Sequence, residues 1–334
     1  MQSICVQNLL SSKTVRSFEN IRKEINVMMD KLEKASSSSS RVNLSKLLMT
    51  LTNDVIARIV LGKKYSSDER EDYSNNLVRR YMEILGASPI GEYIPSLAWN
   101  EIDSFLEKVV QEHVDADEDQ DKTTPFELDR TSLKTLLLVK QIISHQLMIT
   151  RCGVTKNMLF GESASTFTLL EWTMTELMRH PKCMKKLQDE IRSVQPHNSY
   201  VSEKDAEKMN YLYVVIKEAL RLHPPVQINV WAIQRQIATW GPDADEFRPE
   251  RHLDSLLEFH GNDQKYIPFG SGRRKCPGIG LALALAEVTL ANLVNRFDWR
   301  IEVGPLGDDK HDLDEASSID VCRKFPLFAF PSLP

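Results

Sequence analysis

Apolar residues recur at spacings of three and four along most of this chain, a pattern typical of amphipathic helices. Alternating apolar runs that indicate strands occur near the C-terminus, in WRIEV (299–303) and PLFAF (326–330). The sequence therefore predicts one large, mainly α-helical domain with minor β elements. The expected helices cover residues 16–35, 44–62, 75–86, 101–114, 131–149, 165–180, 182–194 and 203–222. Ser202, followed by Asp205, is expected to cap the last of them.

Four stretches interrupt the helical pattern. The serine run at 36–40 is expected to be a flexible loop, and the acidic run DADEDQD at 115–121 a solvated connection. Residues 151–163 have weak periodicity and contain two glycines, so we expect a break there. Residues 224–268 are rich in Pro, Gly and Asp and are expected to form an ordered meander without strands.

Charge and hydropathy exclude several classes of function. The chain has 334 residues and a net charge of −5, so it lacks the basic footprint of a nucleic-acid-binding protein. The longest apolar stretch, 279–294, contains Glu287 and Asn292 and is too short and too polar to span a bilayer. The first residues mix cations with apolar side chains instead of separating them as a signal peptide does. We therefore expect no nucleic-acid partner and no membrane anchor in this chain.

The cysteines are widely spaced and form no C-x-x-C pair. They are Cys5, Cys152, Cys183, Cys276 and Cys322. An odd number with this scatter argues against a disulfide framework and against a cysteine-type zinc site. Most are expected to be buried, inert thiols in a reducing compartment. Only Cys276 has neighbours that suggest chemistry.

Cys276 lies in the loop PFGSGRRKCPGIG (268–280), directly before a long apolar helix pattern. Pro277 suits the first turn of that helix, whose N-terminus offers unpaired N–H groups and partial positive charge. The cations RRK at 273–275 precede the cysteine, and all these groups favour its thiolate form. The glycines of the loop allow the backbone to approach a large, flat partner.

Four interpretations of this loop stay open on its residues alone: a structural cysteine beside a basic patch, a phosphate-binding loop, a cysteine nucleophile, or metal ligation by one thiolate. A phosphate loop is weakly supported, because Lys275 stands where a dinucleotide loop has glycine and the G-K-[ST] ending is absent. A nucleophile needs His and Asn or Asp partners, whose proximity the sequence does not show. A single thiolate can hold a metal if a cofactor supplies the other ligands.

Two further stretches carry charged residues at informative spacings. In KEALRLHPP (217–225), Glu218 and Arg221 are three apart and share a helix face. Taken alone, such a pair is usually a surface ion pair of little energetic value. In FRPERHL (247–253), Arg251 follows a proline-stiffened turn. Because an arginine can donate two parallel hydrogen bonds to a carboxylate, two arginines on one glutamate would form a rigid clasp.

The three stretches together resemble the cytochrome P450 family, haem-thiolate monooxygenases whose haem loop reads Phe-x-x-Gly-x-Arg-x-Cys-x-Gly. The residues that match this loop are Phe269, Gly272, Arg274, Cys276 and Gly278. The residues that match the family's Glu-x-x-Arg and its meander arginine are Glu218, Arg221 and Arg251. The wording of the motifs is similar to that of plant microsomal (A-type) members, whose reactions belong to secondary metabolism.

The resemblance implies haem b as the cofactor, with Cys276 as the axial iron ligand, Arg274 paired with a haem propionate and Phe269 beside the sulfur. It implies that the glutamate and its two arginines are a structural clasp and not a catalytic group. The implied reaction is hydroxylation of a small apolar plant metabolite, with electrons from NADPH delivered by a flavoprotein reductase. The implied location is the endoplasmic reticulum membrane; without an anchor in this chain, the alternative is soluble and cytoplasmic.

Departures from the family pattern indicate a partial domain over residues 1–334. The family's membrane anchor, early helices and a Trp-x-x-x-Arg would precede Met1. The sequence at 140–158 does not resemble the family there, and we interpret it as an insertion. The β hairpin that follows RLHPP in the family is missing after Pro225.

The family's oxygen-activating Ala-Gly-x-Asp-Thr-Thr is also altered. It aligns with residues 161–166, which places Ala164 at the acid and leaves Ser165 and Thr166 as hydroxyls on the oxygen side. Proton delivery by a relay needs a titratable group within reach. A second hypothesis is therefore a truncated, catalytically inactive member with weak or no haem binding. A third, a helical scaffold with an incidental cysteine loop, is disfavoured by three motifs in the family's order.

Overall fold

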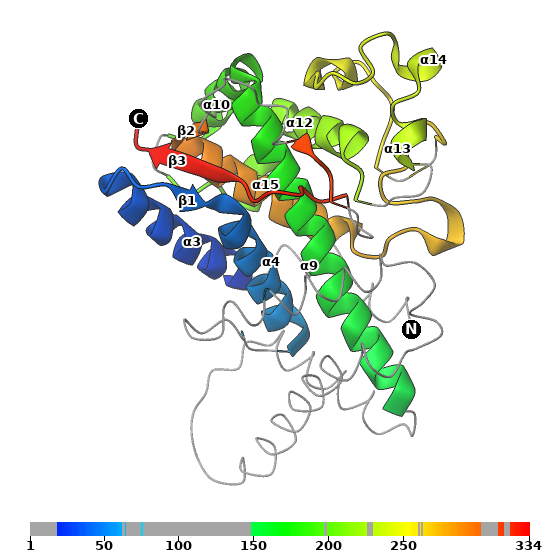
Figure 1. Ribbon diagram of the computed structural model, residues 1–334, viewed down its shortest axis with the longest axis horizontal. Helices are drawn as coiled ribbons and strands as arrows, with labels where there is room; N and C mark the ends of the chain where they lie inside the picture. Colours follow the sequence, from blue (N-terminus) through cyan, green and yellow to red (C-terminus); the bar gives the residue numbers. More distant parts are fainter. Residues whose placement is uncertain are drawn as a thin grey trace.

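The computed structural model describes residues 19–61, 148–196, 199–225, 230–259, 263–301, 313–316 and 321–334, together with the single residues 64, 75 and 261. They form a mainly helical body with one small sheet (Figure 1). The longer helices are α3 (Glu19–Ser37), α4 (Leu44–Leu61), α9 (Met148–Arg179), α10 (Pro181–Val194), α12 (Asn210–Leu222) and α15 (Ile279–Arg296). The shorter ones are α11 (Glu203–Ala206), α13 (Val230–Ile233), α14 (Ile237–Trp240) and the 3-10 helices η2 (Pro249–His252) and η3 (Gly272–Arg274).

The predicted mainly α fold class is confirmed, and so are the predicted helices at 16–35, 44–62 and 182–194, with small shifts of their ends. The helix predicted at 165–180 is the C-terminal half of the longer helix α9. His180 and Pro181 separate α9 from α10 as the sequence predicts, because proline is accepted in the first turn of a helix but not inside one. The predicted helices at 75–86 and 101–114, most of that at 131–149, and the acidic run at 115–121 lie outside the described residues.

The predicted helix at 203–222 is two helices, α11 and α12, separated at Glu207–Met209. Ser202 caps α11 as predicted, and its N–H and hydroxyl both donate to the carboxylate of Asp205. This hydroxyl is the largest cause that lowers the pKa of Asp205 to about 2. The start of α12 is capped from another helix, because Glu190 of α10 accepts the N–H groups of Tyr211 and Leu212 at 2.7 and 2.9 Å.

The serine run at 36–40 was predicted to be a flexible loop, and this prediction is wrong for Ser36 and Ser37, which are helical, whereas residues 38–40 form the turn that follows. Helix α3 continues to Ser37, and the hydroxyl of Ser37 donates to the Glu33 carbonyl at 2.9 Å. Ser38 does the same to Lys34 at 3.0 Å, before a turn in which Ser39 has φ 49°. Serine hydroxyls can satisfy the carbonyls that a helix end leaves without partners, so this run forms an ordered helix C-terminus.

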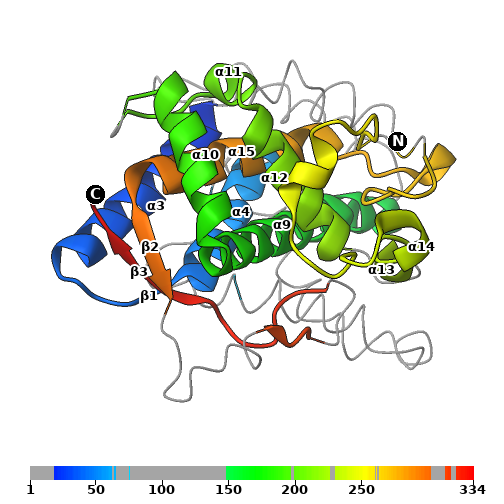
Figure 2. The ribbon, with the colours of Figure 1, turned by 90° about the horizontal axis from the view of Figure 1, so that it is seen from above.

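The predicted break at 151–163 is also wrong. Helix α9 is continuous over Met148–Arg179 and lies across the middle of the body, beside α4 and α15 (Figures 1 and 2). Its two glycines each cost about 1 kcal/mol relative to alanine in a helix. Packing of α9 against α4, α10, α12 and α15 outweighs that local cost.

The sheet joins the two ends of the described chain. Strands β2 (Asp298–Ile301) and β3 (Phe328–Ser332) pair antiparallel, which confirms the two strands expected near the C-terminus. A third strand, β1 (Val42–Asn43), pairs with the other edge of β3, giving the order β1-β3-β2. Because β1 lies between α3 and α4, the C-terminal strand holds these first helices in place.

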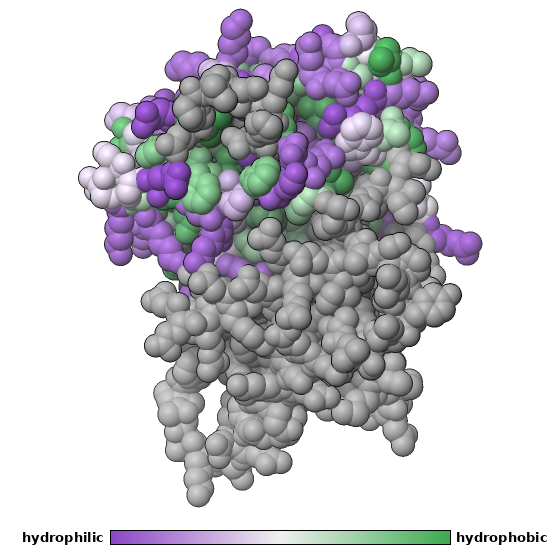
Figure 3. Space-filling model, in the orientation of Figure 1, coloured by the Kyte–Doolittle hydropathy of each residue, from purple (hydrophilic) through white to green (hydrophobic). Residues whose placement is uncertain are grey.

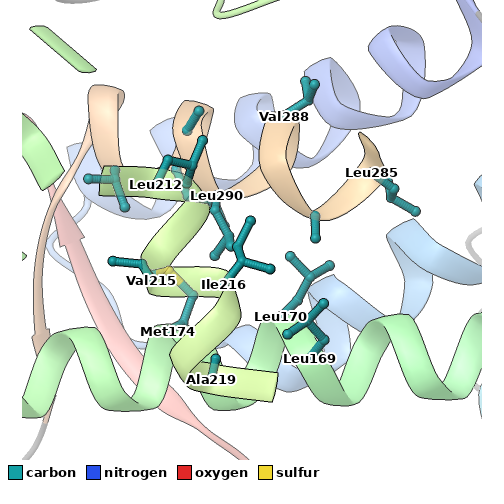
Figure 4. Close-up of a cluster of buried hydrophobic side chains, with 14 of the residues drawn as sticks. Leu169, Leu170, Met174, Leu212, Val215, Ile216, Ala219, Leu285, Val288 and Leu290 are labelled. Carbon is teal, nitrogen blue, oxygen red and sulfur yellow. The ribbon is translucent and has the colours of Figure 1, made fainter. Parts of the chain in front are cut away.

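The core lies where α9, α12 and α15 meet. Leu170 and Met174 of α9 face Ile216 of α12, and Leu285 and Leu290 come from α15 (Figure 4). Burying each such side chain contributes about 1.5–3 kcal/mol. The apolar stretch at 279–294, expected to be too short and too polar to span a bilayer, lies in helix α15, which is long and apolar enough to do so by length and composition alone. In this structure 72% of that helix is buried inside the protein, as in a core helix. On the face in Figure 3, hydrophilic side chains cover much of the described surface.

Candidate functional site

The predicted clasp residues come together in one buried ion cluster. Glu218 lies on α12 and is 0% exposed. Arg221, one turn later, donates from Nε and Nη2 to the two carboxylate oxygens at 2.8 and 2.9 Å. Arg251, on η2, donates from Nε to Glu218 Oε1 at 2.8 Å. The pair is therefore not the exposed surface ion pair that its spacing alone suggests.

Two further donors to Glu218 were missed by the sequence reasoning. His252 Nε2 lies 2.9 Å from Oε2, and the backbone N–H of Arg248 donates to Oε1 at 2.9 Å. Burial by itself raises the pKa of Glu218, but hydrogen bonds from His252 and Arg221 and the charge of Arg221 lower it to about 2. The sequence FRPERHL contains a clue to the role of His252, because this residue directly follows Arg251, and a short 3-10 helix holds both.

The clasp fastens the meander to α12. Arg221 Nη1 donates to the carbonyls of Gln234 and Ala244, both at 2.7 Å. Arg251 Nη2 donates to the carbonyls of Asp243 and Glu246 at 2.9 and 3.2 Å. These bonds satisfy the backbone of a region that forms no strand in its described residues, as predicted for the meander. This geometry indicates a structural role, since the charged groups of Glu218, Arg221 and Arg251 bond to other groups of the protein.

The cysteine loop is closed by its own backbone. The N–H of Cys276 donates to the carbonyl of Phe269 at 3.0 Å, and the N–H of Gly270 donates to Ile267 at 2.9 Å. Gly270 and Gly272 have φ of 72° and 67°, a left-handed conformation that glycine adopts without the strain of a side chain. Helix α15 begins just after the loop, with Gly278 as its N-cap.

The residues of this loop fit a haem. Cys276 is partly buried, its thiol is not in a disulfide, and it packs at the edge of the core. In the part of the chain that the structure describes, and apart from the neighbours of each glycine in the chain, no atom lies within 4 Å of where a Cβ on Gly270 or Gly272 would stand. The described residues therefore leave the glycine side of the loop open. Among the described residues, no three His, Cys, Asp or Glu side chains gather into a metal site. A single thiolate suits a metal that arrives with its other ligands, as the iron of a porphyrin does.

The structure describes the side chain of Phe269 but not that of Arg274, the two other loop residues with a predicted role. Phe269 is 8% exposed and meets the ring of Phe259 edge to face, with centroids 6.1 Å apart. This aromatic pair anchors the start of the loop in the core. The backbone of Arg274 lies in η3, but its side chain lies outside what the structure describes, so its pairing with a propionate stays a prediction.

The predicted oxygen-side residues all lie on α9. Ala164 is 5% exposed and Thr166 is 3% exposed, so both are buried. The hydroxyl of Ser165 donates to the carbonyl of Gly161 at 2.7 Å, one turn earlier on the same helix. This hydroxyl is thus already hydrogen-bonded to its own helix, and α9 places no carboxylate at position 164.

Comparison with known proteins gives one consistent family. The sequence model of the family described as Cytochrome P450 matches residues 1–230 and 225–316. Indoleacetaldoxime dehydratase of Arabidopsis thaliana is 50% identical over 386 aligned residues, which cover 99% of this chain and 74% of that protein. Cytochrome P450 71A27 of the same plant is 50% identical over 386 residues, with 100% and 74% covered. Cytochrome P450 71A12 is 50% identical over 374 residues, with 99% and 74% covered.

These alignments also bear on the interior of the chain. An alignment of 386 residues is longer than the 334 residues of this chain, so the relatives carry internal segments that it lacks. The family match divides at residues 225–230, where the sequence analysis found the hairpin after Pro225 missing. This division lies in the connection between α12 and α13.

Proposed function

Because the chain belongs to the cytochrome P450 family of haem monooxygenases, we propose that it holds haem b through the thiolate of Cys276 and hydroxylates a small apolar plant metabolite. The observation that carries this proposal is the partly buried Cys276, which is in no disulfide and lies in a closed loop before α15. The proposal treats residues 1–334 as one domain that is shorter than its relatives after Pro225.

Each loop residue has a defined role in this proposal. Cys276 ligates the iron, Phe269 flanks the sulfur, and Arg274 pairs with a propionate. The N-terminus of α15 favours a negative sulfur, since its first N–H groups carry partial positive charge. Bound haem supplies the oxygen chemistry. The Glu218 clasp keeps the meander fixed on α12, so that the loop which follows the meander starts from a rigid support.

Electron supply and location are further parts of the proposal. A flavoprotein reductase that uses NADPH would dock on the cysteine side, where Arg273 is exposed. A cation at such a surface steers an acidic partner during encounter. The endoplasmic reticulum membrane is the proposed location, on the family resemblance. Enzyme turnover with and without the reductase is the direct check on the partner.

A second candidate function is dehydration of an aldoxime, and the altered oxygen side of α9 favours it. Loss of water from an aldoxime leaves a nitrile without net oxidation or reduction, so no oxygen has to be activated. In that reaction the hydroxyl on nitrogen leaves as water with the proton given up by the adjacent carbon, so atoms and electrons balance without the oxygen-activating acid that Ala164 replaces or a hydroxyl of Ser165 directed at oxygen. A relative named indoleacetaldoxime dehydratase shares 50% of its aligned residues with this chain.

Oxygen dependence separates the two candidates. The chain loaded with haem is incubated with indoleacetaldoxime in the absence of oxygen, and nitrile is measured by mass spectrometry. Nitrile formation under these conditions supports dehydration. Product that requires oxygen, NADPH and reductase supports the monooxygenase.

The proposed haem ligation is tested by a carbon-monoxide difference spectrum of the reduced, haem-loaded chain. Thiolate ligation produces a Soret band shifted far to the red, and this is the expected result. Cys276→Ala should lose this band, whereas Cys322→Ala, the matched control, should keep it. No haem uptake, or a band at the position of histidine-ligated haem, would support the inactive, truncated alternative instead.

A further inference from the structure

The C-terminus of α12, which carries the clasp, needs hydrogen-bond partners from elsewhere in the chain. The last carbonyls of a helix have no partner within the helix, and the next residues normally supply N–H groups. Here His223 supplies one, to Ala219 at 2.8 Å. It is followed by Pro224 and Pro225, which have no N–H to give. The carbonyls of Leu220 and Arg221, which a continued helix would pair with residues 224 and 225, must therefore be satisfied by other groups, and the carbonyl of Leu222 lies at the same helix end.

Two consecutive side chains after α13 satisfy these carbonyls. Gln234 Nε2 donates to the carbonyls of Leu220 and Arg221 at 2.9 and 3.1 Å. Arg235 donates from Nε and Nη2 to the carbonyl of Leu222 at 3.2 and 2.7 Å. The helix is thus capped at its C-terminus by side chains from the far side of the connection between α12 and α13.

Gln234 also reaches the cysteine loop with the other end of its amide. Its Oε1 accepts the N–H of Ile267 at 3.0 Å. The carbonyl of Ile267 accepts the N–H of Gly270 at 2.9 Å, and Phe269 between them accepts the N–H of Cys276 at 3.0 Å. One side chain therefore joins the clasp helix to the turn from which the cysteine loop starts.

The surroundings of Gln234 require an amide. The side chain is 0% exposed, and it faces two acceptors on one side and one donor on the other. Leucine of similar size offers neither group, and an ionised glutamate offers acceptors alone. The main-chain carbonyl of Gln234 accepts a further bond from Arg221 Nη1 at 2.7 Å, which fixes the backbone beside the amide. Unpaired polar groups left behind in this buried place are costly.

We propose that Gln234 is a positioning residue that sets the place of the Cys276 loop relative to the clasp helix α12. The functional importance of this loop position rests on the proposed function, since a thiolate ligand must be held at a fixed distance from the cofactor. Gln234 acts through Ile267 and does not itself touch the sulfur or the reacting atoms.

The test compares three variants by hydrogen–deuterium exchange of the chain without haem and by the carbon-monoxide spectrum of the chain with haem. Gln234→Leu removes both halves of the contact, and Gln234→Glu keeps the acceptor toward Ile267 but not the donors toward α12. Gln236→Leu is the matched control, because that glutamine is exposed in the same segment. Far-UV circular dichroism establishes that each variant is folded.

In Gln234→Leu, we expect the peptide over residues 263–278 to exchange about tenfold faster, which corresponds to about 1.4 kcal/mol. Peptides of α3 should not change, and the red-shifted band should lose intensity to the band of non-thiolate haem. In Gln234→Glu, the end of α12 should exchange faster while the loop peptide stays close to that of the control. The control should match the parent chain in both readouts.

The inference is overturned if both Gln234 variants match Gln236→Leu in loop exchange and in the spectrum. If Gln234→Leu does not fold, the glutamate variant decides alone: a loosened α12 end with a protected loop supports the inference, and an unchanged α12 end refutes it. A parent chain without a thiolate band would refute the proposed function. The exchange comparison would still decide the role of Gln234, because it needs no haem.

Discussion

Replacing Glu218 by glutamine keeps the shape of the side chain and removes its charge. Arg221 and Arg251 would then be left as buried cations, since their side chains are 0% and 6% exposed. Breaking a buried ion pair in this way costs about 3–5 kcal/mol. The pKa of Glu218 gives a second figure: a fall from 4.5 to about 2 on folding corresponds to about 3 kcal/mol at neutral pH. We therefore expect Glu218→Gln to lose about 3 kcal/mol of unfolding free energy.

Urea unfolding, followed by far-UV circular dichroism at neutral pH, measures this loss. The matched control is Asp189→Asn, which removes an exposed ion pair with Lys185 and should cost less than about 1 kcal/mol. A carboxyl group whose pKa is lower in the folded than in the unfolded protein stabilises the fold when the pH is above its unfolded-state pKa. This stabilisation is lost as the pH falls through its folded-state pKa. The gap between parent and Glu218→Gln should therefore narrow as the pH falls from 4.5 toward about 2. A loss equal to that of the control would refute the reasoning.

Three further changes have expected outcomes. Burial lowers the pKa of His223 from 6.5 despite the carboxylate of Glu176, so the neutral imidazole is the form that favours folding. The urea midpoint of unfolding should therefore fall as the pH drops below 6.5, and His223→Gln should flatten that pH dependence. Asp205→Asn removes the carboxylate of the α11 capping box and should cost about 1 kcal/mol in the same unfolding assay. Gly261 has φ +66°, and Gly261→Ala would place a Cβ 2.3 Å from the carbonyl oxygen of Gly270. Hydrogen–deuterium exchange of the 263–278 peptide should therefore accelerate.

The sequence predicted structural features well where residues close together in the sequence determine them. The end of α9 at His180 and Pro181 follows from proline chemistry. The clasp was predicted as a set because Glu218 and Arg221 share one turn and Arg251 lies in a second recognisable motif. In contrast, the continuity of α9 depends on four neighbouring helices, which its own weak periodicity does not reveal.

The parts that sequence reasoning missed are contacts between distant segments. Gln234 has no local motif, because its partners lie on α12 and at Ile267. The capping of α12 by Glu190 is hidden for the same reason, since the capping side chain belongs to α10. Strand β1 has two residues, too few for an alternating pattern, and exists because β3 offers it an edge.

The capping of α12 by Gln234 and Arg235 also makes the length of the intervening chain a nearly free variable. Both ends of the connection are already joined by hydrogen bonds, so a longer segment between them changes the closure entropy by only about 0.6 kcal/mol for each doubling. Segments could be gained or lost at this point during evolution while the clasp and the loop kept their relative places. The connection is thus a natural insertion point, and grafting a relative's segment there should leave the remainder of the fold in place.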